Sequence, residues 1–130
     1  METINQTYFF PDITPEEVFE AYMNENRHAT FTAAGCQISR DVGGKCIMYD
    51  GYIEAENVKL QPGKLIEQKW VAKEDSWPEG HQSVIQIKLE EKDDGTQLTL
   101  VHSDVPPDLK STLEKGWKDR YWEQMNDYFG

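Results

Sequence analysis

Residues 106–129, PPDLKSTLEKGWKDRYWEQMNDYF, decide the fold. Apolar side chains recur every four positions in this stretch, which is the periodicity of a helix and not of a strand. They are Leu109, Leu113, Trp117, Tyr121, Met125 and Phe129. Because four residues exceed the 3.6 of one helical turn, this apolar stripe moves around the helix by roughly 40° per step. A curved, twisted surface would cover such a stripe, so the sequence predicts one long helix packed on a curved partner.

Before this helix, the chain begins with strand and short-helix signals. Residues 4–10 are rich in β-forming side chains and predict a first strand. Thr14 can then cap a helix that has Pro15 at its first position, and Glu17 can reach back to the cap. The helical pattern fades at residues 24–26, so we expect one or two short helices after the first strand.

From residue 31 to residue 104 the pattern indicates only strands and turns. The expected strands cover residues 34–39, 45–50, 52–60 and 65–72, followed by a hairpin that turns at residues 92–95. The hydrophobic pattern of this hairpin favours one register, because a slip of one residue would mix apolar with polar partners. That register sets Leu89 opposite Leu98, Ile87 opposite Leu100, and Ile85 opposite His102.

Short connections make neighbouring strands antiparallel. We therefore expect an α+β helix-grip fold, in which a curved antiparallel sheet of about six to seven strands wraps around the long C-terminal helix. The chain shows no linker or internal repeat, so residues 1–130 should form a single domain.

Composition narrows the classes of partner. The net charge of −11, from 24 acidic and 13 basic residues, opposes binding to polyanions. We expect no nucleic acid and no membrane as partners. No apolar run approaches the length of a membrane span and the N-terminus does not resemble a secretion signal, so a cytoplasmic location is expected.

The two cysteines, Cys36 and Cys46, have neither the spacing of a zinc site nor the number of a disulfide scaffold. We expect free, buried thiols and neither a metal nor a cofactor. A disulfide between neighbouring strands is the alternative.

Among the three histidines, His102 is the candidate for chemistry, because the hairpin register turns it toward the leucines of the inner face. It either donates to a ligand, acts as a general base or is a hydrogen-bonded core histidine, and the last role is the commonest for such a position. We expect His28 and His81 to be solvated. No catalytic residue is assigned.

Gly116 interrupts the long helix at a cost of about 1 kcal/mol relative to alanine. Either the first helix or a strand approaches it closely, or the missing side chain enlarges a cavity between helix and sheet. The aromatic and aliphatic side chains around it either line such a cavity or fill it. The candidates are Trp70, Ile85, Ile87, Leu98, Leu100, His102, Leu113, Gly116, Trp117 and Tyr121, with Tyr128 as a further aromatic residue.

Several short motifs carry a family resemblance when their order and spacing are taken together. They are Val42-Gly43-Gly44, Asp50-Gly51-Tyr52-Ile53, Trp77-Pro78-Glu79-Gly80, Thr96-Gln97-Leu98-Thr99-Leu100, Val105-Pro106, Gly116-Trp117 and Tyr121-Trp122. From about Pro15 onward the chain resembles the C-terminal domain of activators of heat-shock protein 90 ATPase. The resemblance implies the helix-grip fold of the START and birch-pollen-allergen superfamily, whose members mostly hold hydrophobic small molecules.

Eukaryotic activators carry a separate N-terminal domain, for which this chain has no room, so we expect a stand-alone single-domain member. Three functions remain open. The first is binding of a hydrophobic small molecule between sheet and helix. The second is a co-chaperone-like module that acts on a heat-shock protein 90 type chaperone, with sensitivity at exposed loop residues such as Trp77. The third is a small hydrolase or cyclase that uses His102.

Overall fold

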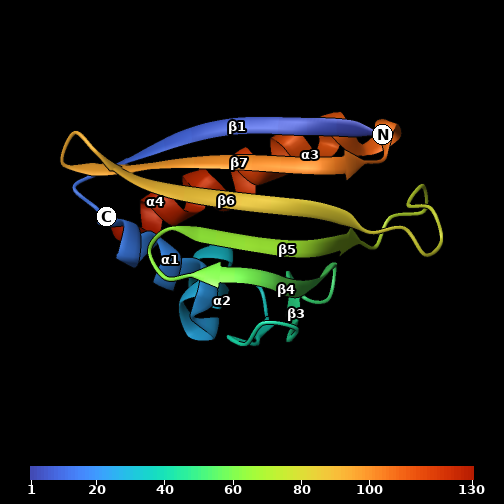
Figure 1. Cartoon of the computed structure of the whole chain (residues 1–130), viewed down its shortest axis with the longest axis horizontal. Helices are drawn as coiled ribbons and strands as arrows, with labels where there is room; N and C mark the ends of the chain where they lie inside the picture. Colours follow the sequence, from blue (N-terminus) through green and yellow to red (C-terminus); the bar gives the residue numbers. More distant parts are fainter.

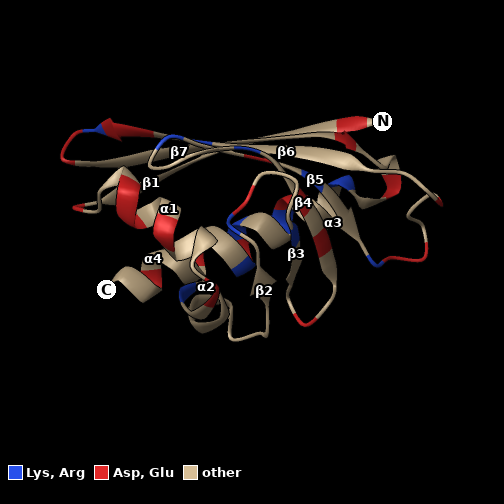
Figure 2. Cartoon of the chain, turned by 60° about the horizontal axis from the view of Figure 1, so that its bottom comes forward, with Lys and Arg blue, Asp and Glu red and all other residues tan.

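The computed structural model describes all of residues 1–130 and contains one curved, seven-stranded antiparallel sheet (Figure 1). The spatial order of the strands is β1-β7-β6-β5-β4-β3-β2. Their bounds are β1 Glu2–Pro11, β2 Gln37–Ile38, β3 Lys45–Met48, β4 Ile53–Gln61, β5 Leu65–Ala72, β6 Ser83–Lys92 and β7 Gly95–Val105. The helices lie together on one side of this sheet (Figure 2). The predicted helix-grip α+β fold is confirmed.

Two short helices follow β1, and the residues between them explain why the sequence pattern faded there. Thr14 is the N-cap of helix α1 (Pro15–Met23), and its hydroxyl accepts a hydrogen bond from the Glu17 amide at 3.2 Å. Asn24 ends α1 and caps α2 (Glu25–Thr32), because its side-chain oxygen accepts from the Arg27 amide at 3.0 Å. The fading pattern thus marks a junction between two helices.

The C-terminal helical segment has four parts, and this differs from the uniform helix that we predicted. They are the 3₁₀ turn η1 (Pro107–Leu109), α3 (Lys110–Gly116), the π-helical segment η2 (Trp117–Trp122) and α4 (Glu123–Phe129). The wider i→i+5 turn of η2 buries both Tyr121 and Trp122, four and five residues after Trp117. The π-helical turn and the curvature of the sheet together therefore keep the drifting apolar stripe buried.

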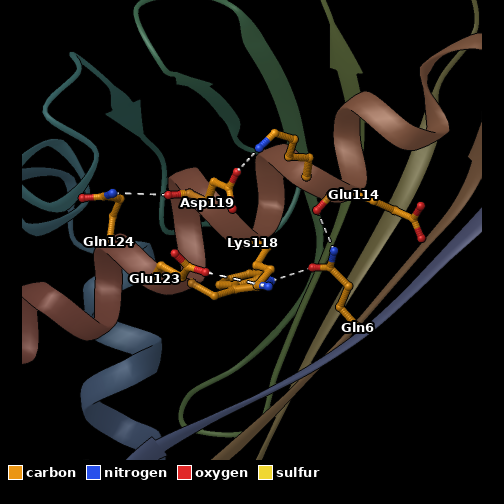
Figure 3. Close-up of polar contacts among 8 residues, drawn as sticks. Gln6, Glu114, Lys118, Asp119, Glu123 and Gln124 are labelled. Atoms are coloured by element: carbon orange, nitrogen blue, oxygen red, sulfur yellow. Dashed lines mark hydrogen bonds and ion pairs between the residues drawn. The ribbon is translucent and has the colours of Figure 1, made fainter.

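Side-chain amides bind the backbone around η2 (Figure 3). Gln6 of β1 donates its Nε2 to the Glu114 carbonyl oxygen at 2.7 Å, and its Oε1 accepts from Trp122 Nε1 at 2.9 Å. Gln124 donates to the Asp119 carbonyl oxygen at 3.3 Å. A π-helical segment interrupts the regular i→i+4 ladder, so carbonyl groups beside it benefit from such partners. Gln6 also fastens the edge strand to the helix.

The early strands are shorter than predicted. The strand expected at residues 34–39 is reduced to Gln37–Ile38, and the next one ends at Met48 instead of residue 50. The cause of the early end is a turn in which Tyr49, Asp50 and Gly51 all have left-handed backbone, with φ of 55°, 56° and 90°. Such residues cannot continue a strand.

The β6–β7 hairpin has the predicted register, with Leu89 opposite Leu98, Ile87 opposite Leu100 and Ile85 opposite His102. These residues belong to the core between sheet and helices. Both cysteines are free thiols as predicted, and Cys46 is buried as predicted, whereas Cys36 is only half-buried. None of the helices is both long enough and apolar enough to span a bilayer.

Candidate functional site

A pocket of about 50 Å³ opens between the β3–β4 turn, β5 and the C-terminal helical segment. Half of the predicted cavity residues line it, namely Trp70, Leu113, Gly116, Trp117 and Tyr121. Four further residues that were not predicted also line it, namely Tyr49, Tyr52, Ile53 and Arg120. The helical periodicity predicted the lining residues of the C-terminal helical segment. The lining residues of the β3–β4 turn follow no comparable sequence pattern.

The other predicted cavity residues do not line this pocket. Ile85, Ile87, Leu98, Leu100 and His102 are at most 1% exposed and lie in the packed core. Tyr128, near the end of α4, is 38% exposed and packs beside Phe31 and Phe129. The structure thus brings five of the candidates together around a pocket and places the remainder elsewhere.

The pocket widens into an outer hollow of about 590 Å³, which shares Tyr49, Tyr52, Leu113, Gly116 and Arg120 with it. Polar side chains line the remainder of the hollow, namely Glu74, Thr112, Lys115 and Asp119. The site therefore has a narrow apolar interior and a wide polar mouth.

The β3–β4 turn forms one wall and is held in an unusual conformation. A bulky residue such as Tyr49 rarely adopts positive φ, and backbone of this kind concentrates at functional sites. Gly35 pins the turn, because its amide donates to Asp50 Oδ1 at 2.7 Å and its carbonyl oxygen accepts from the Asp50 amide at 2.9 Å. The rings of Tyr49 and Tyr52 are in this way fixed at the pocket.

Gly116 forms part of the opposite wall. A Cβ built on this glycine meets no atom within 4 Å, so neither α1 nor a strand approaches it. The close-approach explanation of Gly116 is therefore wrong, and the missing side chain leaves open space at the pocket.

Gly116→Ala should raise the free energy of unfolding by about 0.5–1 kcal/mol, because the backbone is helical and the methyl group meets open space. Gly51 is the matched control, since it also faces open space but has a φ of +90°. Gly51→Ala should lower the free energy of unfolding by about 1 kcal/mol. Urea unfolding of both variants followed by circular dichroism measures the difference, and a destabilised Gly116→Ala would contradict the open geometry.

Trp70, one of the lining residues, has an unsatisfied polar group that is buried. Its side chain is 2% exposed, and its Nε1–H is the one buried side-chain nitrogen or oxygen without a hydrogen-bond partner in the chain. The indole is held between Trp117 and Trp77, with ring centroids 5.7 and 6.0 Å away. A buried donor without an acceptor costs about 1–3 kcal/mol.

Arg120 gives the mouth an unpaired cation. Its guanidinium carbon lies 5.8 Å from the Tyr49 ring centroid, and no carboxylate lies within ion-pair distance of it. By contrast, Lys115 pairs with Asp119 at 2.7 Å. The Glu74 carboxylate accepts a hydrogen bond from the Tyr52 hydroxyl. The other charged groups at the mouth are therefore already engaged.

His102 is enclosed by hydrogen bonds. Trp117 Nε1–H can only donate, so His102 Nδ1 accepts from it at 3.1 Å and the ring hydrogen sits on Nε2. Nε2 donates to Ser83 Oγ at 2.9 Å, and that hydroxyl donates to the Trp70 carbonyl oxygen at 2.6 Å. Burial lowers the pKa of His102 to about 3. The arrangement is that of a neutral core histidine.

His28 is buried, which corrects the expectation that it is solvated. It is 0% exposed, its Nδ1 donates to the Tyr22 carbonyl oxygen at 2.8 Å, and its Nε2 accepts from the Tyr121 hydroxyl at 3.0 Å. Burial lowers its pKa to about 4, partly offset by the bond to Tyr22. The spacing of His28, Phe31 and Thr32 on α2 was the sequence signal for a buried face.

Trp77 and His81 are also less exposed than predicted. Trp77 is half-buried, its ring lies against Trp70, and its Nε1 donates to the His81 carbonyl oxygen at 2.8 Å. His81 is half-buried and donates from Nε2 to the Asp104 carbonyl oxygen at 2.7 Å. Both residues fasten the long loop between β5 and β6 to the sheet.

Comparison with known proteins gives a consistent result. The sequence model of the family described as "Activator of Hsp90 ATPase homolog 1-like protein" matches residues 12–130. The human protein named "Activator of 90 kDa heat shock protein ATPase homolog 1" is 31% identical over 128 residues, 98% of this chain and 36% of that protein. A Dictyostelium discoideum homologue is 30% identical over 119 residues, 89% of this chain and 30% of that protein.

Solved structures share the fold. The crystal structure of an HSP90 activator from Plasmodium falciparum superimposes with a TM-score of 0.87 and 19% identity, covering 100% of this chain and 97% of that one. The present chain spans about a third of the length of the curated relatives it matches.

Proposed function

This chain belongs to the family of Activator of Hsp90 ATPase homolog 1-like proteins, and from that membership we propose that it is an interaction module that binds a chaperone of the 90 kDa heat-shock class and raises its ATPase rate. The observation that carries the proposal is the 31% identity with the human activator, which extends over 98% of this chain. The match covers 36% of the human protein. Activation of the chaperone ATPase, which that protein's name gives for the whole protein, is therefore inferred for this chain.

The environment of His102 supports a binding role more than a hydrolytic one. Both ring nitrogens are already hydrogen-bonded, and the ring is 0% exposed. A general base needs to reach the proton that it removes. His102 as placed here serves the packing of Trp117 against the sheet.

A direct assay tests the proposed function. The chaperone purified from the same organism should hydrolyse ATP faster when the chain is added, and the increase should saturate with chain concentration. Isothermal titration calorimetry of the same pair measures binding independently of turnover. An unrelated ATPase, which should not respond, is the control. Absence of both binding and stimulation would refute the proposal.

A second candidate function is the binding of a small apolar molecule between sheet and helix. The observation that favours it is the pocket between β5 and the C-terminal helical segment, seven of whose nine lining residues are hydrophobic. Of the predicted cavity residues, we propose that those lining the pocket contact the ligand and that the core residues behind them provide rigid support. Native mass spectrometry of protein purified from its own cells should then show a stoichiometric additional mass, whereas a bare chain under conditions that retain tight ligands would count against this candidate.

A further inference from the structure

We propose that the outer edge of β1 is a docking site for an extended, cationic segment of another protein, which pairs with β1 as an additional strand of the sheet. This site is separate from the pocket, and its occupation does not depend on the chaperone. It combines open backbone groups on β1, an edge without the usual protection, a hollow beside that edge and an excess of carboxylates around it.

β1 lies at one edge of the sheet and pairs only with β7 (Figure 1). Just beyond the strand, the Asp12 amide donates to the Asp94 carbonyl oxygen at 3.1 Å, at the position that continues the register of β1 and β7. In an antiparallel pair every second residue bonds to the partner strand. The even-numbered residues of β1 therefore bond to β7, and the backbone N–H and C=O groups of the odd-numbered ones point outward. These outward residues are Asn5, Thr7 and Phe9.

Pro11 agrees with this alternation. It has no backbone N–H and occupies an outward position, which is where an edge strand tolerates proline. No other backbone or side-chain group of the chain bonds to the outward backbone groups of β1. Unpaired N–H and C=O groups in a row are a template for another strand.

The β1 edge lacks the protection that sheet edges normally have. Charges, prolines, bulges or a short length usually prevent the pairing of an edge with another chain. The opposite edge follows this rule, because β2 has only two residues. β1 has ten residues, and residues 3–10 include neither a charged side chain nor a proline. Its register shifts only at its start, between Glu2 and Ile4.

A hollow of about 180 Å³ lies between β1 and the C-terminal helical segment. Its lining residues are Gln6, Thr7, Tyr8, Lys118 and Trp122. Figure 3 shows Gln6 of β1 reaching toward the helical segment that carries Lys118. A strand directs alternate side chains to opposite faces of a sheet, so every second side chain of an added strand faces this hollow. Strand addition obtains affinity from main-chain hydrogen bonds and specificity from such recesses for alternate side chains.

The charges around the edge favour a cationic segment. Burial, followed by the negative charges of Glu123 and Asp127, raises the pKa of Tyr8, so both carboxylates act on this strand. Lys118 lies 4.0 Å from Glu123. Asp127 and Glu114, also on this helical segment, have no cation within ion-pair distance. A lysine or arginine of an added strand would give these carboxylates the partner that they lack.

A second copy of this chain suits the edge less well than a different protein. Pairing β1 with β1 of another copy would bring the same carboxylates of both chains together, and each chain carries a net charge of −11. Like charges across an interface oppose association. The segment that docks therefore belongs to another protein and has basic residues flanking a short β-forming stretch.

Three synthetic peptides test the proposal. In acetyl-KTVTVTK-amide the lysines and valines share one side of a strand and the threonines the other. Acetyl-ETVTVTE-amide reverses the charge, and acetyl-KTVPVTK-amide has a central proline that prevents full pairing. We expect the first peptide to bind about tenfold more tightly than either of the others.

Amide hydrogen exchange identifies the edge directly. In the free chain the outward amides of Asn5, Thr7 and Phe9 should exchange rapidly, and the first peptide should slow all three. The amides of Gln6 and Tyr8 already bond to β7, so their slow exchange should change little.

Two pairs of substitutions separate backbone pairing from charge. Thr7→Pro removes one outward N–H without breaking a bond to β7, and it should weaken acetyl-KTVTVTK-amide about tenfold. Thr7→Ala is its control, because it also alters the side chain but keeps the N–H, and it should change the affinity less than about twofold. Asp127→Asn should weaken the same peptide about threefold, whereas Asp75→Asn, exposed in the β5–β6 loop, should have no effect. Circular dichroism verifies that each variant is folded, and the aspartate pair leaves the sheet unchanged.

Unchanged exchange at the three outward amides with the first peptide at millimolar concentration would overturn the proposal. Equal affinities for the lysine and glutamate peptides would overturn its cationic partner. Analytical ultracentrifugation of the free chain tests the occupant. A monomer supports a segment of another protein, whereas a dimer that Thr7→Pro dissociates would show that a second copy occupies the edge and would overturn the choice of partner.

Discussion

Acidification from about pH 7 to about pH 5 should lower the free energy of unfolding of this protein by about 3–4 kcal/mol. Two buried histidines cause the loss. In the unfolded chain a histidine has a pKa of about 6.5, whereas burial lowers the pKa of His28 to about 4 and that of His102 to about 3 in the folded chain.

The direction follows from which state binds protons first. As the pH falls below about 6.5 the unfolded chain takes up two protons that the folded chain refuses, so its free energy drops relative to the folded state. Stability is therefore complete above about pH 7 and declines as the pH falls toward the folded pKa values. Because small domains have only about 5–15 kcal/mol of stability, the loss is a large fraction of the total.

Urea unfolding at a series of pH values measures this effect. The range above about pH 5 isolates the histidines, since most carboxylates titrate lower. His28→Gln and His102→Gln should each remove about half of the pH dependence, and the double variant should remove nearly all of it, whatever each substitution costs at neutral pH. A stability that stays flat between these pH values would contradict the burial of both imidazoles.

The local parts of the fold were predictable because short stretches encode them. The Thr14 cap, the apolar stripe of the last helix and the register of the β6–β7 hairpin each depend on regular spacing within one continuous stretch of at most 21 residues, and all three are present. Spacing of four residues is compatible with an α-helix and with one that contains a π-helical turn. The burial of Trp122, five residues after Trp117, was therefore not predictable from the stripe.

The candidate site was predictable on its helical side only. Leu113, Gly116, Trp117 and Tyr121 share a face of the helix, so periodicity identifies them as neighbours. Tyr49 lies at the pocket because three successive residues adopt left-handed backbone, and hydrogen bonds between Asp50 and Gly35, 15 positions earlier, hold this conformation. A contact of this kind between two irregular segments leaves no periodic pattern in the sequence.

His28 shows the same limit in a residue that we expected at the surface. Arg27 and Thr30 beside it are exposed and gave α2 a polar appearance. Its burial depends on Tyr121, 93 positions further along the chain, whose hydroxyl bonds the imidazole. Polar aromatic contacts between α2 and the C-terminal helical segment close this part of the core. The spacing of His28, Phe31 and Thr32 indicates a buried face of α2 but not the partner that covers it.

Trp117 is the residue whose truncation should cost the most. Its indole is 3% exposed, stacks on Trp122 with centroids 5.3 Å apart and planes 11° from parallel, and donates to His102 Nδ1. Trp117→Ala should lower the free energy of unfolding by about 3–5 kcal/mol, because it leaves a cavity at the centre of the helix–sheet contact. It also leaves an acceptor on His102 without its donor.

Two companion variants divide this cost. Trp117→Phe keeps an aromatic ring but lacks the N–H. Its free energy of unfolding should fall by about 1–3 kcal/mol, because His102 Nδ1 is left without its donor. Lys118→Ala, at the exposed neighbouring position, should change the free energy of unfolding by less than about 0.5 kcal/mol. Circular dichroism is the appropriate signal, since removal of a tryptophan alters the fluorescence itself. If Trp117→Ala were as mild as Lys118→Ala, the C-terminal helical segment would not be gripped by the sheet at this residue, and the pocket beside it would lose its wall.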